Sequence, residues 1–202
     1  MSPRKLRIRL LRIAFVPIVF IAIFVRPDWA LESSMAFIME ASGFIFLLAG
    51  LLIRIWCTFY IGGQKSKELI TNGPYSLCRN PLYIGTFILA IGVGLSFENL
   101  IMLALVPAII LPVHMIVIRM EETHLERIFS EQYRMYRQKV PRFWPNLSNY
   151  NSPDPLTVNV NAIRRITMDT VGILLLPWIE DLLEVLHHNE VIPVLWYFPK
   201  LI

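Results

Sequence analysis

The sequence contains few charged residues and very little cysteine. Of its 202 residues, 17% are charged and 55% are hydrophobic, whereas soluble domains average about 25% charged and about 45–50% apolar residues. The two cysteines, Cys57 and Cys78, form no disulfide framework and lack metal-ligand spacing, so we expect free thiols and no metal site. There is also no internal repeat and no low-complexity tract. This composition predicts an integral membrane protein built as one domain or one compact bundle.

Four apolar segments are long enough to cross a membrane. The last two are separated only by Glu98 and Asn99, which predicts a tight helical hairpin. No small-x-small cleavage site follows the first segment, so we interpret it as a retained anchor and not as a signal peptide. The predicted fold is therefore all-α, with about four transmembrane helices and cytoplasmic amphipathic helices that form a pocket. The four segments cover residues 10–25, 35–61, 81–97 and 100–118.

The distribution of lysine and arginine predicts how these segments are oriented. Five basic residues lie between residues 4 and 12, three lie between residues 62 and 79, and nine follow residue 118. The two opposite loops contain only Arg26. Because cytoplasmic loops are rich in lysine and arginine, both termini and residues 73–85 should be cytoplasmic, and we expect a bacterial inner membrane. We therefore attribute the net charge of +4 to membrane topology and to contact with anionic headgroups, and not to nucleic acid binding.

Polar segments with helical periodicity follow the fourth apolar segment. Residues 119–145 predict a cytoplasmic amphipathic helix that ends at Val140-Pro141, and residues 146–161 are typical of a linker. A helical pattern returns over residues 162–188, but its apolar part is too short and too close to charges to span, so it should lie at the membrane interface or pack on the bundle. The predicted organisation is N-terminal transmembrane helices over 1–61, a core over 62–145, and a linker with an interfacial helical extension over 146–202.

Two polar clusters flank the predicted hairpin, namely GPYSLCRNPLYIG at residues 73–85 and the pair Glu121-Glu122. Because the hairpin brings its two ends together, Arg79 and Asn80 should meet the two glutamates at one mouth. Cations, carboxylates and aromatic rings beside lipid suit a zwitterionic cofactor on the cytoplasmic side and a lipophilic substrate from the membrane. The alternative is an ion-paired collar that only anchors the hairpin, since charges next to a membrane are common.

The order of residues in these two clusters resembles a known enzyme family. The pattern G-P-Y-x-x-x-R-N-P-x-Y-x-G, a hairpin, and then E-E-x-x-L-x-x-x-F-x-x-x-Y-x-x-Y-x-x-x-V-P-R-F is similar to the isoprenylcysteine carboxyl methyltransferases, to which phospholipid N-methyltransferases are related. The resemblance covers roughly residues 60–145. It implies a membrane enzyme that uses S-adenosyl-L-methionine to methylate a lipophilic small molecule or a lipidated substrate, with the carboxylate of a prenylated or lipidic substrate favoured.

The resemblance also implies roles for individual residues, with Arg79 and Glu122 as the catalytic pair. A zwitterionic amino-acid tail needs a cation for its carboxylate and an acceptor for its ammonium group, which Arg79 and one of the two glutamates can supply. A tyrosine ring can lie against the sulfonium or the adenine. The residues implied to bind the cofactor are Tyr75, Arg79, Asn80, Pro81, Tyr83, Gly85, Glu121, Glu122, Tyr133 and Arg142.

Two positions depart from the family pattern. Position 80 is Asn, where prenylcysteine enzymes usually have His, and this weakens the expectation of a prenylcysteine substrate but not of the cofactor. Position 130 is Ser, where Gly is typical, which we expect to be a minor change in a turn.

Several alternatives stay open at the level of sequence. Sterol reductases that use NADPH have a comparable Arg-x-x-Tyr loop, and a non-catalytic scaffold could use Arg79 and the glutamates only as a brace. Within the apolar segments, Arg54 can snorkel to the surface and His114 can bond a carbonyl freed by Pro112, or either can contact a substrate head group. We expect membrane lipids and a lipophilic substrate as partners, no nucleic acid, and leave the oligomeric state open.

Overall fold

The computed structural model describes residues 13, 16–27, 34–62, 68–153, 156 and 158–198. Within these residues the protein is built almost entirely of helices, which confirms the predicted class, and the sequence analysis missed two strands of three residues each. A helix over residues 16–24 precedes the first strand. The elements that follow are β1 (Val25–Pro27), α2 (Ser34–Ile61), α3 (Pro74–Leu77), α4 (Pro81–Ser96), α5 (Leu100–Lys139), the 3-10 turn η1 (Leu147–Asn149), α6 (Val160–Leu174), α7 (Leu176–His188) and β2 (Trp196–Phe198).

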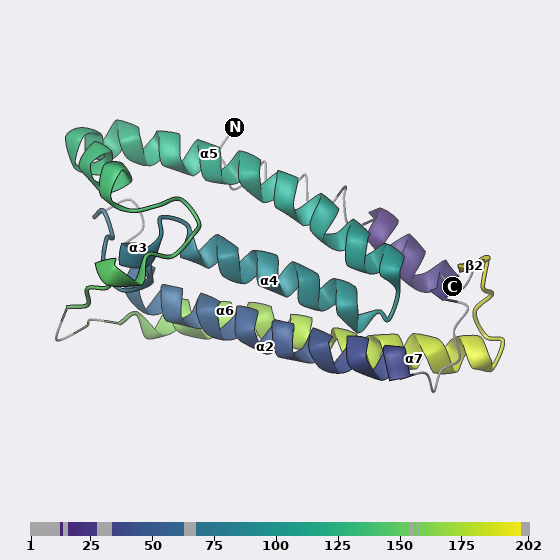
Figure 1. Cartoon of the computed structure of the whole chain (residues 1–202). Helices are drawn as coiled ribbons and strands as arrows, with labels where there is room; N and C mark the ends of the chain where they lie inside the picture. The colour runs from purple at the N-terminus through teal and green to yellow at the C-terminus, as the bar shows by residue number, and fades with distance from the viewer. Residues whose placement is uncertain are drawn as a thin grey trace.

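The long helices lie side by side in an elongated bundle, with α4 between α2 and α5 (Figure 1). Among the described residues, α2 and α5 are the two helices long and apolar enough to cross a membrane, with 28 and 40 residues. The apolar helix α4 has 16 residues and forms the predicted hairpin with α5. Of the predicted segment 10–25, residues 10–12, 14 and 15 lie outside the described residues.

Helix α5 joins two predicted elements into one. The sequence predicts a membrane-spanning segment that ends at Ile118 and a separate amphipathic helix after it, whereas the structure has no break there: α5 continues to Ser130, where the helix is interrupted, and its last part ends before Val140-Pro141, as expected. Ser130 has φ 42° and ψ −109°. This conformation suits glycine and is costly for a residue with a Cβ. The Ser at position 130 is therefore more than a minor change in a turn, because it occupies the kink of the helix.

Helices α2 and α4 pack through glycines that bring their backbones together. A Cβ on Gly50 would lie 2.8 Å from the carbonyl oxygen of Gly85, and a Cβ on Gly92 would lie 2.9 Å from the backbone nitrogen of Leu47. Small residues allow membrane helices to approach in this way. The absence of a side chain at Gly85 therefore serves helix packing.

Two polar side chains within the apolar helices have protein partners. Arg54 on α2 donates from Nη1 to Thr86 Oγ1 on α4 at 2.6 Å, so its side chain reaches a neighbouring helix and does not simply snorkel. His114 Nδ1 lies 2.8 Å from the carbonyl oxygen of Ile110, one turn earlier in α5. A backbone partner for His114 was expected, although the carbonyl that Pro112 frees belongs to Ala108.

The C-terminal helices α6 and α7 pack along α2 and α4. After them, β2 pairs in parallel with β1, with Val25 opposite Trp196. Figure 1 shows this pair at the end of the bundle that lies far from α3. The end of the described chain therefore lies at the opposite end of the bundle from the segment 73–85. The predicted packing of residues 162–188 on the bundle is confirmed.

Candidate functional site

The segment 73–80 turns sharply between α2 and α4 at one end of the bundle. Gly73 has φ 58°, and a Cβ there would lie 2.3 Å from a ring carbon of Tyr60, so the turn requires glycine. Pro74 begins α3 and Pro81 begins α4, positions where proline's fixed φ fits and its missing N–H costs nothing. The expected place of Pro81 in the first turn of its helix is confirmed.

A strap formed by residues 140–152 crosses this turn and binds it through backbone hydrogen bonds. The Arg79 amide donates to the Pro141 carbonyl at 2.8 Å, and the Gly73 amide donates to the Asn151 carbonyl at 2.6 Å. The strap therefore brings the two separated sequence motifs into one site.

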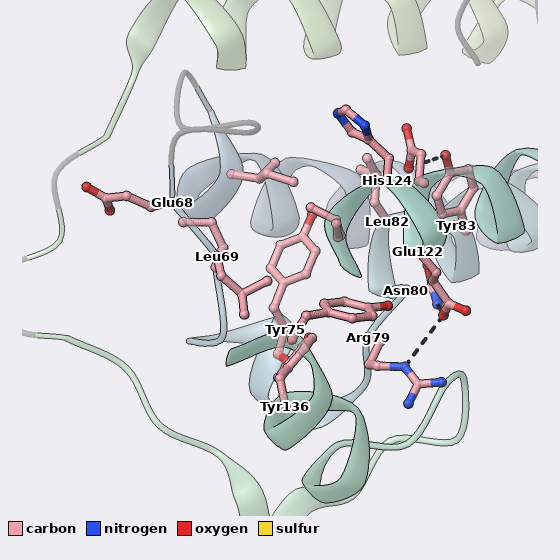
Figure 2. Close-up of a pocket in the computed structure, with 15 residues that line it drawn as sticks. Glu68, Leu69, Tyr75, Arg79, Asn80, Leu82, Tyr83, Glu122, His124 and Tyr136 are labelled. Atoms are coloured by element: carbon pink, nitrogen blue, oxygen red, sulfur yellow. Dashed lines mark hydrogen bonds and ion pairs between the residues drawn. The ribbon is translucent and has the colours of Figure 1, made fainter. Parts of the chain in front are cut away.

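Glu122 on α5 is the centre of a charged cluster at this end of the bundle. Its carboxylate accepts from Asn80 Nδ2 at 2.9 Å and from Arg142 Nη2 at 2.8 Å, and Arg79 Nε lies 3.5 Å from it. Figure 2 shows Arg79, Asn80 and Glu122 gathered on one side of the pocket. The predicted meeting of Arg79 and Asn80 with the glutamate pair is confirmed.

Arg79 is also held from a second direction. Its Nη1 donates to the carbonyl oxygens of Arg137 at 2.9 Å and Val140 at 3.3 Å. These carbonyls belong to the C-terminal turn of α5, which lacks intrahelical donors. The guanidinium side chain is only 11% exposed. Its position is therefore set by the protein, as a preorganised anion-binding group requires.

Tyr83 and Glu121 form a second polar pair, with the Tyr83 hydroxyl donating to Glu121 Oε2 at 2.7 Å. The Tyr83 ring lies on the other side against His114, in an edge-on arrangement with 5.7 Å between ring centroids. Tyr83 therefore links the polar pocket to the apolar interior of the α4–α5 hairpin, where it packs with Val117 and Ile118.

These polar groups line a pocket between the end of α2, the segment 68–83 and α5. Seven of the ten residues expected at a cofactor site line it, namely Tyr75, Arg79, Asn80, Tyr83, Glu121, Glu122 and Tyr133. Pro81, Gly85 and Arg142 are not among the lining residues. Pro81 starts α4, Gly85 packs against α2, and Arg142 acts on the pocket through Glu122.

Two tyrosine hydroxyls in the pocket wall have no hydrogen-bond partner among the described residues. They belong to Tyr75 and Tyr133, whose side chains are 6% and 1% exposed. Burial raises the pKa of Tyr75 well above its usual range, so its hydroxyl stays protonated and is available as a donor. The neighbouring Tyr136 differs, because its hydroxyl donates to the Tyr75 carbonyl at 2.7 Å. Buried polar groups normally bond to protein or to ordered water, so these two hydroxyls are free to bond to water or to a polar ligand in the pocket.

The pocket also contains residues that the sequence analysis did not assign to it. Its opposite side carries Glu68 and Leu69 (Figure 2), for which the sequence had no signal. His124 and Leu125 follow Glu121 by three and four positions, and helical spacing could have found them. The remaining additions are Ile61, Ile70, Leu82 and Tyr136. The lining therefore combines polar groups with apolar side chains.

Comparisons with known proteins bear on what such a pocket does. The model of one protein family, described as phospholipid methyltransferase, matches residues 34–132 of this chain. The protein-S-isoprenylcysteine O-methyltransferase of Schizosaccharomyces pombe is 31% identical over 83 residues, which cover 40% of this chain and 35% of that protein. The chain belongs to the family of membrane methyltransferases. The family resemblance seen in the sequence is thereby confirmed.

Two other proteins similar to this chain are named for metal resistance. The nickel-cobalt-cadmium resistance protein NccN of Alcaligenes xylosoxydans xylosoxydans is 34% identical over 146 residues, covering 72% of this chain and 68% of that protein. The cobalt-zinc-cadmium resistance protein CzcN of Cupriavidus metallidurans is 34% identical over 139 residues, covering 69% of this chain and 64% of that protein. Within the described residues, no group of three or more His, Cys, Asp or Glu side chains could hold a metal ion. No solved structure gives a significant match.

Proposed function

We propose that this membrane methyltransferase uses S-adenosyl-L-methionine and methylates a lipophilic acceptor that reaches the site from the membrane. The main support for this proposal is the set of polar groups that line the pocket. It combines a fixed guanidinium group, two carboxylates and two buried hydroxyls without partners in the described chain. A brace that served only to anchor the hairpin would leave no reason for the orphan hydroxyls.

The chain's own residues supply what the cofactor would need. Arg79 is placed to hold the cofactor carboxylate, and one of Glu121 and Glu122 would accept from its ammonium group. The hydroxyls of Tyr75 and Tyr133 would donate to other polar atoms of the cofactor, and their rings offer faces to a cation. S-adenosyl-L-methionine would supply an electrophilic methyl group on a sulfonium.

We propose that Arg79 and Glu122 are the residues on which transfer depends most. In-line methyl transfer requires mainly alignment and exclusion of water. Because Glu122 already binds Asn80 and Arg142, its first effect would be to hold Arg79 in place. With an amine acceptor, Glu122 would also be the candidate to take the proton.

The acceptor would lie against the apolar side chains of the pocket, beside the membrane end of the bundle. The apolar residues that line the pocket are Ile61, Leu69, Ile70, Leu82 and Leu125. The favoured acceptor, from the family resemblance, is the carboxylate of a prenylated or lipidic molecule. Transfer of a labelled methyl group to lipid extract distinguishes the classes, since a methyl ester is lost in base and an N-methyl group is retained.

We also propose that the pocket end of the bundle faces the cytoplasm of a bacterial cell, with the N-terminus on that side. The helix at residues 16–24, α2, α4 and α5 would be the four predicted spans. The supporting observation is the excess of lysine and arginine near the pocket end, against the single Arg26 in the loops at the other end.

Calorimetry with S-adenosylhomocysteine tests the proposed function. We expect saturable binding by the wild-type protein and binding weaker by about 1.5–3 kcal/mol in Arg79→Ala, the range for a hydrogen bond to a charged group. Absence of wild-type binding would reject the methyltransferase proposal, and binding of NADPH in its place would favour a reductase. Retained activity and affinity in a folded Arg79→Ala, Glu122→Ala double variant would show that these two residues only brace the hairpin and that the functional site lies elsewhere.

A further inference from the structure

The C-terminal helix pair α6–α7 runs along α2 from the pocket end to the far end of the bundle. At the pocket end, a Cβ on Gly62 would lie 3.0 Å from Cβ of Ala162. At the far end, Pro177 and Trp178 line a shallow pocket together with Phe37 and Phe44 of α2. The pair is therefore antiparallel to α2 over most of its length, as Figure 1 shows.

The length of this path exceeds the apolar thickness of a bilayer. Helices α6 and α7 together run from Val160 to His188, a rise of about 42 Å at 1.5 Å per residue, and the hydrocarbon core of a bilayer is about 30 Å thick. Because α6 packs on α2 and α7 packs on α4, and α2 is one of the two helices suited to cross a membrane, the pair follows the bundle over a length sufficient to cross as well.

The outward face of α6–α7 is mainly apolar and carries four exposed charged residues, Arg164, Arg165, Asp169 and Asp181. Between Arg165 and Glu180 the sequence has one charged residue, Asp169. Arg164 and Arg165 are exposed at the pocket end, where arginine can snorkel to headgroups. The exposed apolar residues of the pair are Met168, Val171, Leu175, Trp178, Ile179, Leu182 and Val185.

This apolar face is continuous with the exposed apolar surface of α2, which includes Phe44, Ile45, Leu48 and Leu52. The inward face is closed by the protein, since Thr170 is fully buried and its hydroxyl donates to the carbonyl of Ile166 at 2.7 Å. Acyl chains are the occupant that fits an exposed apolar face lying beside a membrane-crossing helix.

Hydrogen bonds hold the far end of the pair to the far end of the N-terminal helix. His187 Nε2 lies 2.7 Å from the carbonyl oxygen of Ile23. The Leu195 amide donates to the Phe24 carbonyl at 3.0 Å, and β2 then pairs with β1. Glu180 and Glu184 are partly buried near this end, and each interacts with another group of the protein.

We propose that α6–α7 is an additional membrane-spanning element, interrupted at Leu175 between the two helices, whose outer face lies against lipid acyl chains. Residues 189–198 are then on the opposite side of the membrane from the pocket. This placement replaces the expectation of an interfacial extension and of a cytoplasmic C-terminus. It does not depend on the proposed cofactor or substrate.

Labelling of single cysteines with a membrane-impermeant maleimide tests this topology in bacterial cells. Wild-type protein is the background control, because Cys57 and Cys78 are 0% and 1% exposed. We expect Glu190→Cys to label in intact cells and Arg137→Cys, at the pocket end of α5, to label only after the membrane is permeabilised. Asn189→Cys and Glu131→Cys serve as second positions if either variant fails to accumulate.

A single cysteine at a third position shows whether the outer face of α6–α7 contacts lipid or water. Val171→Cys lies in the middle of the outer face and should not label in permeabilised membranes, but should label once the protein is denatured. Labelling at residues 190 and 137 under the same condition, or labelling at residue 171 before denaturation, would overturn the proposal. Labelling at 190 and 137 on opposite sides, with residue 171 protected, supports it whichever side carries the pocket.

Discussion

Replacing Tyr133 by Phe removes one of the two orphan hydroxyls while keeping the ring. A ring of the same shape preserves packing, and loss of a buried, unsatisfied hydroxyl is neutral or stabilising for the free protein, by up to about 1 kcal/mol. If the hydroxyl donates to the cofactor, the same change removes one hydrogen bond from the complex. Binding of S-adenosylhomocysteine should then weaken by about 0.5–1.5 kcal/mol, or about two- to thirteenfold. Tyr75→Phe should behave in the same way.

Tyr136→Phe is the matched control for this prediction. Its hydroxyl has a protein partner, the Tyr75 carbonyl at 2.7 Å, so the change removes a bond from the folded protein itself. We expect it to lower stability by about 1–2 kcal/mol, which corresponds to roughly 2–8 °C in melting temperature for a protein of this size.

Two measurements on each detergent-solubilised variant are sufficient, calorimetric affinity for S-adenosylhomocysteine and the melting temperature without ligand. If the hydroxyls of Tyr75 and Tyr133 bind the ligand, their Phe variants should show weaker affinity with no loss of melting temperature. If both variants lose melting temperature and keep wild-type affinity, the hydroxyls are structural, and the assignment of the pocket from its orphan groups is refuted.

Five further substitutions, at four positions, test the geometry of the site and the helices. Ser130→Gly should stabilise the protein by about 1 kcal/mol, because Ser130 has a positive φ, and Ser130→Val should destabilise it, both read from melting temperature. Gly73→Ala should disrupt the turn and abolish S-adenosylhomocysteine binding. Gly172→Ala is its control, because a Cβ there would meet nothing within 4 Å; it should leave affinity unchanged and raise stability by about 0.5–1 kcal/mol. Equal effects of the two substitutions would contradict the steric argument. Glu122→Gln should lower both the melting temperature and the affinity for S-adenosylhomocysteine, because Arg79 and Arg142 lose their shared carboxylate. The affinity should fall by about 1.5–3 kcal/mol. Wild-type values of both quantities would contradict the assignment of Glu122 as the centre of the charged cluster.

Much of the site was predictable because its motifs are local. The Gly73-Pro74 turn and Pro81 at the start of α4 follow from backbone chemistry that a few residues define. The short loop between the two hairpin helices also requires their other ends to approach. Because Arg79 and Asn80 precede one of these helices and Glu122 lies in the other, this requirement is enough to bring them together.

Other features depend on contacts between segments that are distant in the chain. No local pattern distinguishes Tyr136, whose hydroxyl is satisfied, from Tyr133, whose hydroxyl is not, because the difference is the position of the Tyr75 carbonyl. Gly85 was predicted to line the cofactor site, and its actual neighbour is α2. Both outcomes are set by how the helices pack.

The sequence by itself determined the class of the protein, its hairpin and the place of its polar site, because hydropathy, charge and turn residues act over short distances. The tertiary structure alone decided which hydroxyls in the pocket lack partners and where the chain goes after residue 160. With Asp169 near its middle, the segment after residue 160 does not stand out as apolar by composition. Its position beside α2, with Thr170 turned inward and Val171 outward, is visible only when the helices are packed together.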